Sequence, residues 1–175
     1  IINSTNKMNE LIDDILSFSG LSQKRLSFQK FSMQSLVGDV LSFIQPSVAY
    51  PNAVITIQDG LPSAYGDTAM VFQMLSNLIG NALKYSSKKE KPEVIVGFDD
   101  QQSAYFVKDN GIGFDQKHKE RIFGVFNRFV GQEFEGSGIG LAIVRRAIEK
   151  HDGAIWVESV LDEGTIFYFN FKEEC

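Results

Sequence analysis

Cysteine, long apolar runs and positive charge are all scarce in this sequence of 175 residues. The one cysteine is Cys175, so the chain cannot close an internal disulfide and lacks the thiolates of a structural zinc site. No stretch reaches the roughly 20 apolar residues that span a bilayer. The 22 acidic residues outnumber the 17 basic ones, which disfavours a nucleic-acid partner. We therefore expect a cytoplasmic chain, with any membrane anchor of the full-length protein outside these residues.

Two common nucleotide-binding signatures are also absent. There is no Gly-Lys dipeptide and hence no Walker A loop, and there is no Gly-x-Gly-x-x-Gly fingerprint. His118 lies in a charged run and His151 beside a helix-ending Asp-Gly pair, so we expect both histidines to be structural or solvated. Phenylalanine, in contrast, is abundant, with 15 residues against one tryptophan and five tyrosines. Its alternation near the C-terminus predicts a packed core that contains strands.

The apolar pattern predicts a helix over residues 1–19, which looks like a segment cut from a longer helical unit, followed by strands and helices. Strands are expected at 26–32, 53–58, 93–98, 103–109, 154–159 and 165–171, and helices at 34–45, 67–85, 115–122 and 139–151, with a loop over 123–138. Most strands come in adjacent pairs with helices grouped between them. This order predicts an α+β two-layer sandwich.

The helix expected over 67–85 carries one polar face. Gln73, Asn77, Asn81 and Lys84 occupy an arc of about 80°, and Tyr85 follows them. The residues expected to face the core from the opposite side are Val71, Phe72, Leu75, Leu78, Ile79, Ala82 and Leu83. Asn is a mediocre helix former, but its carboxamide oxygen can coordinate Mg²⁺, and Lys can neutralise a phosphate. From these residues alone, a solvated face and a ligand-binding face both remain open.

Two glycine-rich turns are the other candidate sites. Asp109-Asn110-Gly111-Ile112-Gly113 follows a predicted strand, so the Asp could accept a hydrogen bond from an amine while the glycines let a ligand approach. Gly136-Ser137-Gly138-Ile139-Gly140-Leu141 opens a predicted helix, where free N–H groups and the helix dipole favour phosphate. Asp-Asn-Gly is also a common turn, and alternating glycines can arise by chance. Neither turn alone decides the function.

Taken in order, four patterns resemble the N, G1, F and G2 boxes of sensor histidine kinases. They are Asn77-x-x-x-Asn81, Asp109-x-Gly111-x-Gly113, Phe123-x-x-Phe126 and Gly136-x-Gly138-x-Gly140. Residues 1–24 resemble the second helix of the dimerisation and histidine-phosphotransfer hairpin, and residues 25–175 resemble the ATP-binding catalytic domain. The resemblance implies a Bergerat-type fold, in which a mixed sheet of about five strands is backed by three helices and preceded by one long N-terminal helix.

The resemblance also implies roles for individual residues. Asp109 would bind the adenine amino group and Asn81 would coordinate Mg²⁺. Asn77, Lys84 and Tyr85 would line the phosphate and ribose side, with Asn77 and Lys84 acting in catalysis, and Arg128 would act from a lid that extends from Gly113 to Gly136. The other cofactor-binding residues implied are Gly111, Ile112, Gly113, Phe123, Phe126, Gly136, Ser137, Gly138, Ile139, Gly140, Leu141 and Thr165. The implied cofactors are ATP and Mg²⁺.

Asn77 and the absence of a phosphoacceptor histidine indicate which reaction to expect of this chain. Related ATPases that hydrolyse ATP resemble one another in having a Glu four residues before the Mg²⁺-binding Asn, whereas Asn77 cannot accept a proton at neutral pH. That difference favours a histidine acceptor over water. Since the phosphoacceptor His is absent, we expect this chain to bind ATP without phosphorylating itself. The full-length kinase would form a homodimer through the hairpin and pass its phosphoryl group to a response-regulator receiver domain, with no nucleic acid involved.

Two alternatives stay open at this point. The first is a non-catalytic nucleotide-binding module that serves regulation or dimerisation. The second is an ATP-hydrolysing domain of the chaperone or topoisomerase type, which Asn77 disfavours.

Overall fold

The computed structural model describes residues 26–125, 134 and 137–172. In chain order the elements are β1 (Phe28–Ser32), α2 (Met33–Ile44), α3 (Pro46–Ala49), β2 (Val54–Ile57), β3 (Ser63–Asp67), α4 (Thr68–Ser86), β4 (Glu93–Asp99), β5 (Ala104–Asp109), the 3₁₀ turns η1 (Gln116–His118) and η2 (Arg121–Phe123), α5 (Gly140–Lys150), β6 (Ala154–Val160) and β7 (Gly164–Asn170). The helix predicted over residues 1–19 lies outside the described residues, as does most of the loop predicted over 123–138.

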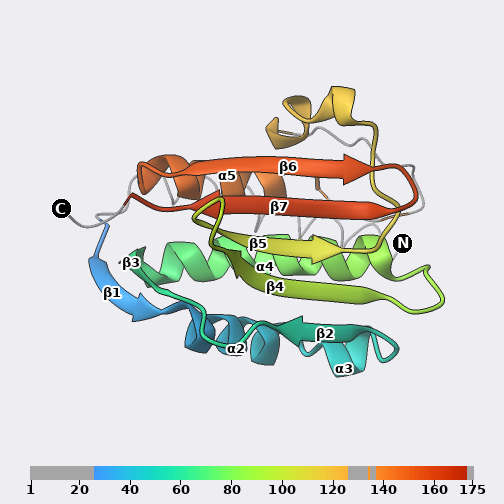
Figure 1. The fold of residues 1–175 in the computed structure, drawn as a ribbon, viewed down its shortest axis with the longest axis horizontal. Coiled ribbons are helices and arrows are strands. Elements are labelled where there is room, and N and C mark those ends of the chain that lie inside the picture. Colours follow the sequence, from blue (N-terminus) through green and yellow to red (C-terminus); the bar gives the residue numbers. More distant parts are fainter. Residues whose placement is uncertain (1–25, 126–133, 135–136, 173–175) are drawn as a thin grey trace, which may run out of the picture.

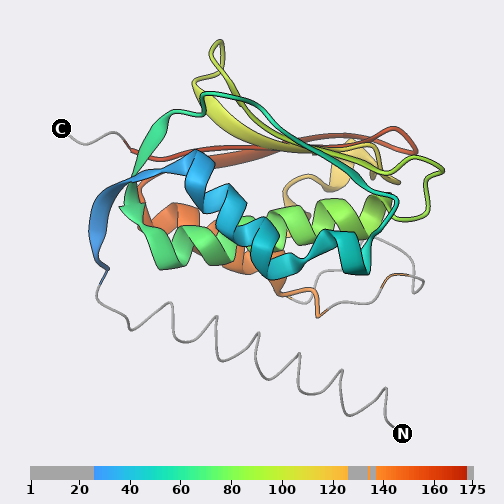
Figure 2. The same cartoon turned by 90° about the horizontal axis from the view of Figure 1, so that it is seen from below.

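A mixed five-stranded sheet forms one layer of the molecule. Its strand order is β2-β4-β5-β7-β6, in which β2 runs parallel to β4 and the other neighbours are antiparallel. Helices α2, α4 and α5 cover one face of this sheet (Figure 1 and Figure 2). The predicted α+β sandwich is confirmed, and the four-residue α3 adds a short helix to the three that the resemblance implied behind the sheet.

Helix α4 packs between α2 and α5 and supplies much of the core. Six of the seven residues predicted to face inward are buried, namely Val71, Leu75, Leu78, Ile79, Ala82 and Leu83. Phe72 is only half buried, because its ring makes an edge contact at 5.6 Å with the exposed Phe43 of α2. The predicted polar arc is half buried along its length. The amphipathic pattern therefore gave the correct orientation of α4.

A buried histidine joins the start of α4 to the end of α5. Asp67 caps α4 by accepting a hydrogen bond from the Met70 N–H at 3.0 Å. The Asp67 N–H donates to Nε2 of His151 at 2.9 Å, and Nδ1 of His151 lies 2.7 Å from the Ala147 carbonyl oxygen. Because a carbonyl only accepts, the His151 proton lies on Nδ1. His151 is a structural residue, as predicted.

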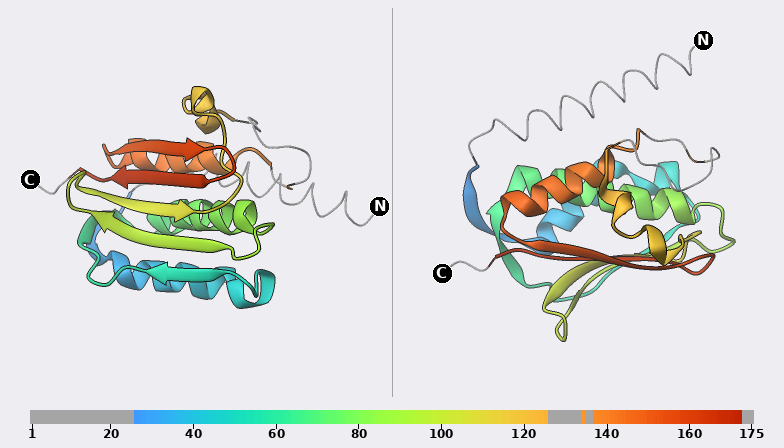
Figure 3. Two further views of the ribbon diagram at one scale, coloured as in Figure 1. Left: turned by 45° about the vertical axis from the view of Figure 1, so that its right-hand side comes forward. Right: turned by 90° about the horizontal axis from the view of Figure 1, so that it is seen from above.

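The two-stranded sheet of β1 and β3 was not predicted. β3 pairs antiparallel with β1, at the end of the molecule where α4 begins (Figure 3). The β3 sequence, Ser-Ala-Tyr-Gly-Asp, contains no β-branched residue and includes Gly and Asp, which are depleted in strands, so its strand signal is weak. The pairing partner and the burial of Ala64 produce this strand.

The helix predicted over 115–122 is wrong. This segment forms the two turns η1 and η2 beside the edge strand β6 (Figure 1). Gln116 donates to the Val157 carbonyl at 3.0 Å and accepts from the Ser159 N–H at 2.9 Å, while Ile122 and Phe123 enter the core. One continuous helix would not place Gln116 against β6 and also bury Ile122 and Phe123. The segment therefore bends between η1 and η2.

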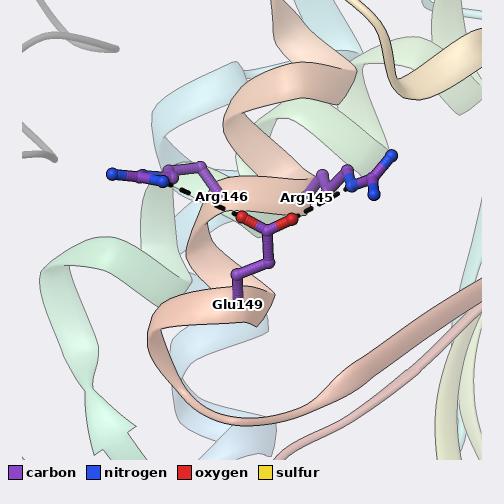
Figure 4. Close-up of polar contacts among 3 residues, drawn as sticks. All are labelled: Arg145, Arg146 and Glu149. Atoms are coloured by element: carbon purple, nitrogen blue, oxygen red, sulfur yellow. Dashed lines mark hydrogen bonds and ion pairs between the residues drawn. The ribbon is translucent and has the colours of Figure 1, made fainter.

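The outer face of α5 carries an exposed group of charges. Glu149 accepts a hydrogen bond from Nε of Arg145 at 3.1 Å and lies 3.9 Å from a terminal nitrogen of Arg146 (Figure 4). Such i,i+4 and i,i+3 pairs on a solvated face contribute about 0.3–0.5 kcal/mol each. No helix within the described ranges is long and apolar enough to cross a membrane.

Candidate functional site

The polar arc of α4 contacts the start of α5. Nδ2 of Asn77 donates to the Gln73 carbonyl at 2.9 Å. This bond leaves the amide oxygen facing Gly140, the first residue of α5, so closely that a Cβ on Gly140 would lie 2.5 Å from it. Glycine at this position therefore lets two predicted site segments, the Asn77 turn of α4 and the N-terminus of α5, lie side by side.

Asp109 is a buried carboxyl at the end of β5. Its side chain is 5% exposed, and the Gly111 N–H donates to Oδ1 at 2.8 Å. Burial raises its pKa to about 6, although hydrogen bonds from the backbone at Gly111 and Thr165 act in the opposite direction. An acidic group with a perturbed pKa in a buried site is a candidate for ligand recognition.

The turn after Asp109 fits between the end of α4 and the β6–β7 turn. Ile112 donates its N–H to the Tyr85 carbonyl at 3.2 Å, and a Cβ on Gly111 would lie 2.6 Å from the same carbonyl oxygen. Gly113 has a φ of +55°, and a Cβ there would overlap the Val160 carbonyl. At both glycines the space that a side chain would fill is occupied by the protein's own backbone. This close packing brings the Asp109 turn against the end of α4.

Aromatic rings and lysines cluster at the end of α4. The Tyr85 ring meets the buried Phe134 edge to face, with a centroid distance of 5.3 Å. Nζ of Lys84 lies 4.6 Å from the Tyr85 centroid, and Nζ of Lys88 lies 4.8 Å from the Phe134 centroid. Two cations, one beside the half-buried Tyr85 ring and one beside the buried Phe134 ring, form a surface suited to an anionic ligand with an apolar part.

The segment before α5 is held by its own polar groups. Oγ of Ser137 accepts a hydrogen bond from the Ile139 N–H at 3.2 Å, and Gly138 has a φ of +75°. Ile139 is fully buried and Leu141 half buried. Ile139 and Leu141 therefore contribute to the hydrophobic core, while the N-terminus of α5 lies beside Asn77.

Other predicted site residues have different surroundings. Phe123 is 9% exposed and packs against Phe167 at a centroid distance of 6.2 Å, so most of its ring lies in the core. Phe126, Arg128 and Gly136 lie outside the described residues. Thr165 is buried directly opposite Asp109 on β7.

Two polar side chains near Asp109 were missed in the sequence. Ser159 is buried opposite Thr165, with its Oγ 3.0 Å from the Thr165 hydroxyl. Gln116 bonds to the backbone on either side of Glu158, through the Val157 carbonyl and the Ser159 N–H. A serine in a strand and a glutamine in a charged run carry no signal of their own. The expected register of the last two strands could have placed Ser159 beside Thr165.

A family model described as histidine kinase-, DNA gyrase B-, and HSP90-like ATPase matches residues 66–174. The matched range includes α4, the Asp109 turn and the start of α5, which are the three parts of this site. The chain belongs to this ATPase family.

Curated relatives of this ATPase domain include histidine kinases. Cyanobacterial phytochrome B of Nostoc sp. is 35% identical over 178 residues, which cover 99% of this chain and 24% of the relative. The methanogenesis regulatory histidine kinase FilI of Methanothrix harundinacea is 36% identical over 165 residues, which cover 93% of this chain and 18% of the relative. The chain thus spans less than a quarter of the length of these two relatives.

Solved structures agree with the family assignment. Full-length ShkA, solved in complex with AMPPNP, has a TM-score of 0.77 at 27% identity, over 95% of this chain and 36% of that chain. The catalytic domain of histidine kinase ThkA has a TM-score of 0.65 at 26% identity, over 82% of this chain and 93% of that chain. The ATPase domain described here has the fold of a histidine kinase catalytic domain.

Proposed function

We propose that this domain binds ATP between α4, the Asp109 turn and the start of α5, and delivers the γ-phosphoryl group to a histidine on a separate helix. The observation that carries the proposal is the buried Asp109 carboxyl, which lies beside the Tyr85 end of α4. As a carboxylate it would accept a hydrogen bond from the adenine amino group. Membership of the ATPase family and the AMPPNP bound to ShkA support a nucleotide ligand.

The remaining site residues divide between two ends of the nucleotide. Gly111, Ile112, Gly113 and Thr165 would form the adenine end, near Asp109. Asn77, Lys84 and Tyr85 would line the ribose and phosphate end, together with Ser137, Gly138, Ile139, Gly140 and Leu141 at the start of α5. Phe123, Phe126, Arg128 and Gly136 would belong to the lid side of the site, as the family resemblance implies.

Asn77 favours phosphoryl transfer to histidine over hydrolysis. Its amide donates to the Gln73 carbonyl and its oxygen lies against Gly140. An amide cannot accept a proton at neutral pH, so it cannot activate a water molecule as a general base. A neutral imidazole needs less activation as a nucleophile than water does.

Asn81 would hold Mg²⁺ through its carboxamide oxygen. In the part of the chain that the structure describes, no group of three or more His, Cys, Asp or Glu side chains could bind a metal. Mg²⁺ commonly uses one or two protein oxygens and completes its shell with water and phosphate oxygens, which fits a single amide ligand beside a triphosphate. When bound, the metal would neutralise charge on the transferred phosphoryl group.

Asn81→Ala is expected to lower ATP affinity at least tenfold in the presence of Mg²⁺, a loss on the scale of perturbed metal sites. The affinity measured in EDTA should stay unchanged, because the variant removes only the metal contact. Isothermal titration calorimetry with and without Mg²⁺ measures both values. Asn52→Ala, in the exposed turn before β2, is the matched control. Equal losses with and without Mg²⁺ would contradict the assignment of Asn81 to the metal.

We also propose that residues 1–24 form the second helix of a dimerisation hairpin and that residues 25–175 are the ATP-binding domain. The full-length protein would be a homodimer in the cytoplasm, with a response-regulator receiver domain as its partner. The histidine kinases among the relatives support this assignment.

The 175-residue chain is expected not to phosphorylate itself. Both ring nitrogens of His151 are engaged in hydrogen bonds within the buried end of α5, and His118 lies on η1 beside β6. Incubation with labelled ATP should therefore leave the chain unlabelled, whereas addition of a hairpin that carries an accessible histidine should produce an acid-labile label on the hairpin. An acid-labile phosphate that is lost in His118→Ala or His151→Ala would overturn this expectation.

A further inference from the structure

Three buried polar side chains form a row across the inner face of the sheet. Asp109 on β5 is directly opposite Thr165 on β7, and Thr165 is directly opposite Ser159 on β6. Their exposed fractions are 5%, 7% and 8%. The adjacent row on the same face is Val107, Phe167 and Val157, which is entirely apolar. Buried polar groups in such a setting need defined hydrogen-bond partners.

Ser159 uses all of its hydrogen-bonding capacity within the protein. Its Oγ lies 2.9 Å from the Phe114 nitrogen, 3.1 Å from the Gly164 carbonyl oxygen and 3.0 Å from Oγ1 of Thr165. A hydroxyl has one proton and two acceptor positions. The Phe114 N–H can only donate and the Gly164 carbonyl can only accept, so the Ser159 proton points to Gly164. The remaining contact is satisfied when Thr165 donates its proton to Ser159.

This arrangement fixes what Thr165 can offer to a ligand. With its proton directed to Ser159, the Thr165 oxygen has only lone pairs left. The Asp109 carboxylate opposite it is also an acceptor. Thr165 and Asp109 therefore both present acceptors to a ligand. The Thr165 oxygen is held in this role through Ser159, which the Phe114 N–H and the Gly164 carbonyl at the start of β7 fix in place.

We propose that Ser159 is a specificity-determining residue that makes the site select 6-aminopurine over 6-oxopurine nucleotides. This inference rests on the proposed binding of adenine at Asp109. A 6-amino group donates hydrogen bonds to two acceptors, whereas a 6-oxo group presents a lone pair to them. Ser159 acts through Thr165, because it prevents the threonine hydroxyl from turning and donating to an oxo group.

Inosine triphosphate is the appropriate probe, because its base has a 6-oxo group where ATP has the amine. The measured quantity is the ratio of the dissociation constants for inosine triphosphate and ATP. Ser159→Ala is expected to reduce this ratio about twofold to tenfold, the range for one neutral hydrogen bond gained or lost. Ser86→Ala, which removes a buried hydroxyl bonded only to carbonyls of α4, should leave the ratio unchanged.

A double-mutant cycle separates this role from a structural one. Thr165→Val keeps the side-chain shape and removes the oxygen, so it should also reduce the ratio, and Ser159→Ala in the T165V background should change it no further. A full further change in that background, or an unaltered ratio in S159A, would overturn the inference. If S159A does not fold, T165V alone decides: an unaltered ratio overturns the proposal.

Measurements on the unmodified protein distinguish a failure of the proposed ATP site from a failure of the role given to Ser159. Failure of the unmodified chain to bind either nucleotide overturns the proposed function and this inference with it. Binding of both nucleotides with the same ratio in wild type, S159A and T165V overturns the inference alone and leaves the proposed ATP site standing.

Discussion

Asp109→Asn is expected to weaken ATP binding about 100-fold, the upper range for a hydrogen bond to a charged group. The carboxylate at the end of β5 accepts from the adenine amino group in the proposed site. An amide can turn its single oxygen either to the Gly111 N–H or to the base, so its NH₂ group faces another donor in either orientation. Isothermal titration calorimetry at pH 7.5 measures the affinity, and Asn52→Ala serves again as the control. ATP affinity within threefold of wild type would contradict the role given to Asp109.

The same substitution should reveal what the buried charge does to stability. Burial raises the pKa of Asp109 from its ordinary value of 3.8 to about 6, so the folded state binds more protons than the unfolded state between these pH values. Stability from this group is present at low pH and is lost as the pH rises through about 6. Without nucleotide, the wild type should therefore gain about 2 kcal/mol relative to D109N when the pH falls from 7.5 to 4.5.

Urea denaturation of both proteins at the two pH values checks this prediction, because the other titrating groups cancel in the difference. A difference that is constant with pH, or that changes in the opposite direction, would contradict a raised pKa at Asp109. The expected result would mean that the domain retains a destabilising buried acid at neutral pH, at the position where its ligand is proposed to bind.

Local patterns in the sequence were enough to predict most of the fold. α4 begins and ends within one residue of the predicted range, and its apolar stripe has the predicted side in the core. Strands β4, β5, β6 and β7 are also within one or two residues of the prediction. These elements have strong periodicity over many residues, and the periodicity reflects burial directly.

The errors lie where tertiary contacts overrode local preference. β3 has a weak strand composition, with Gly and Asp beside its one tyrosine, and it pairs with β1. The η1–η2 segment was predicted as a helix, but the bonds from Gln116 to β6 hold it in another conformation. Each of these contacts joins segments more than 30 residues apart, so no local window contains the information.

The candidate site also contains residues that the sequence indicated and residues that only the structure revealed. Asp109, Asn77 and Gly140 could be chosen from the sequence because they belong to motifs that follow one another in the order of a known family, although each motif alone left a structural interpretation open. Ser159 and Gln116 could not, since their importance comes from three-dimensional partners across β6 and β7. The sequence also indicates that Gly113 is needed, and the structure adds why.

Gly113→Ala is expected to destabilise the protein by at least about 3 kcal/mol, because two costs combine. The φ of +55° is unfavourable for a residue with a side chain, and the added Cβ would overlap the Val160 carbonyl in the β6–β7 turn. That carbonyl is backbone and cannot rotate away as a side chain does. The turn after Asp109 would have to separate from β6 and β7, which also carry Thr165 and Ser159.

Two other glycines separate these costs. Gly60 has a φ of +74° with nothing within 4 Å of its added Cβ, so Gly60→Ala should cost only about 1–2 kcal/mol. Gly38 lies inside α2 with the same open space, so Gly38→Ala should stabilise the protein by about 1 kcal/mol through helix propensity. Urea denaturation gives all three values. Equal losses in G113A and G60A would show that backbone conformation, and not the Val160 contact, requires glycine at position 113.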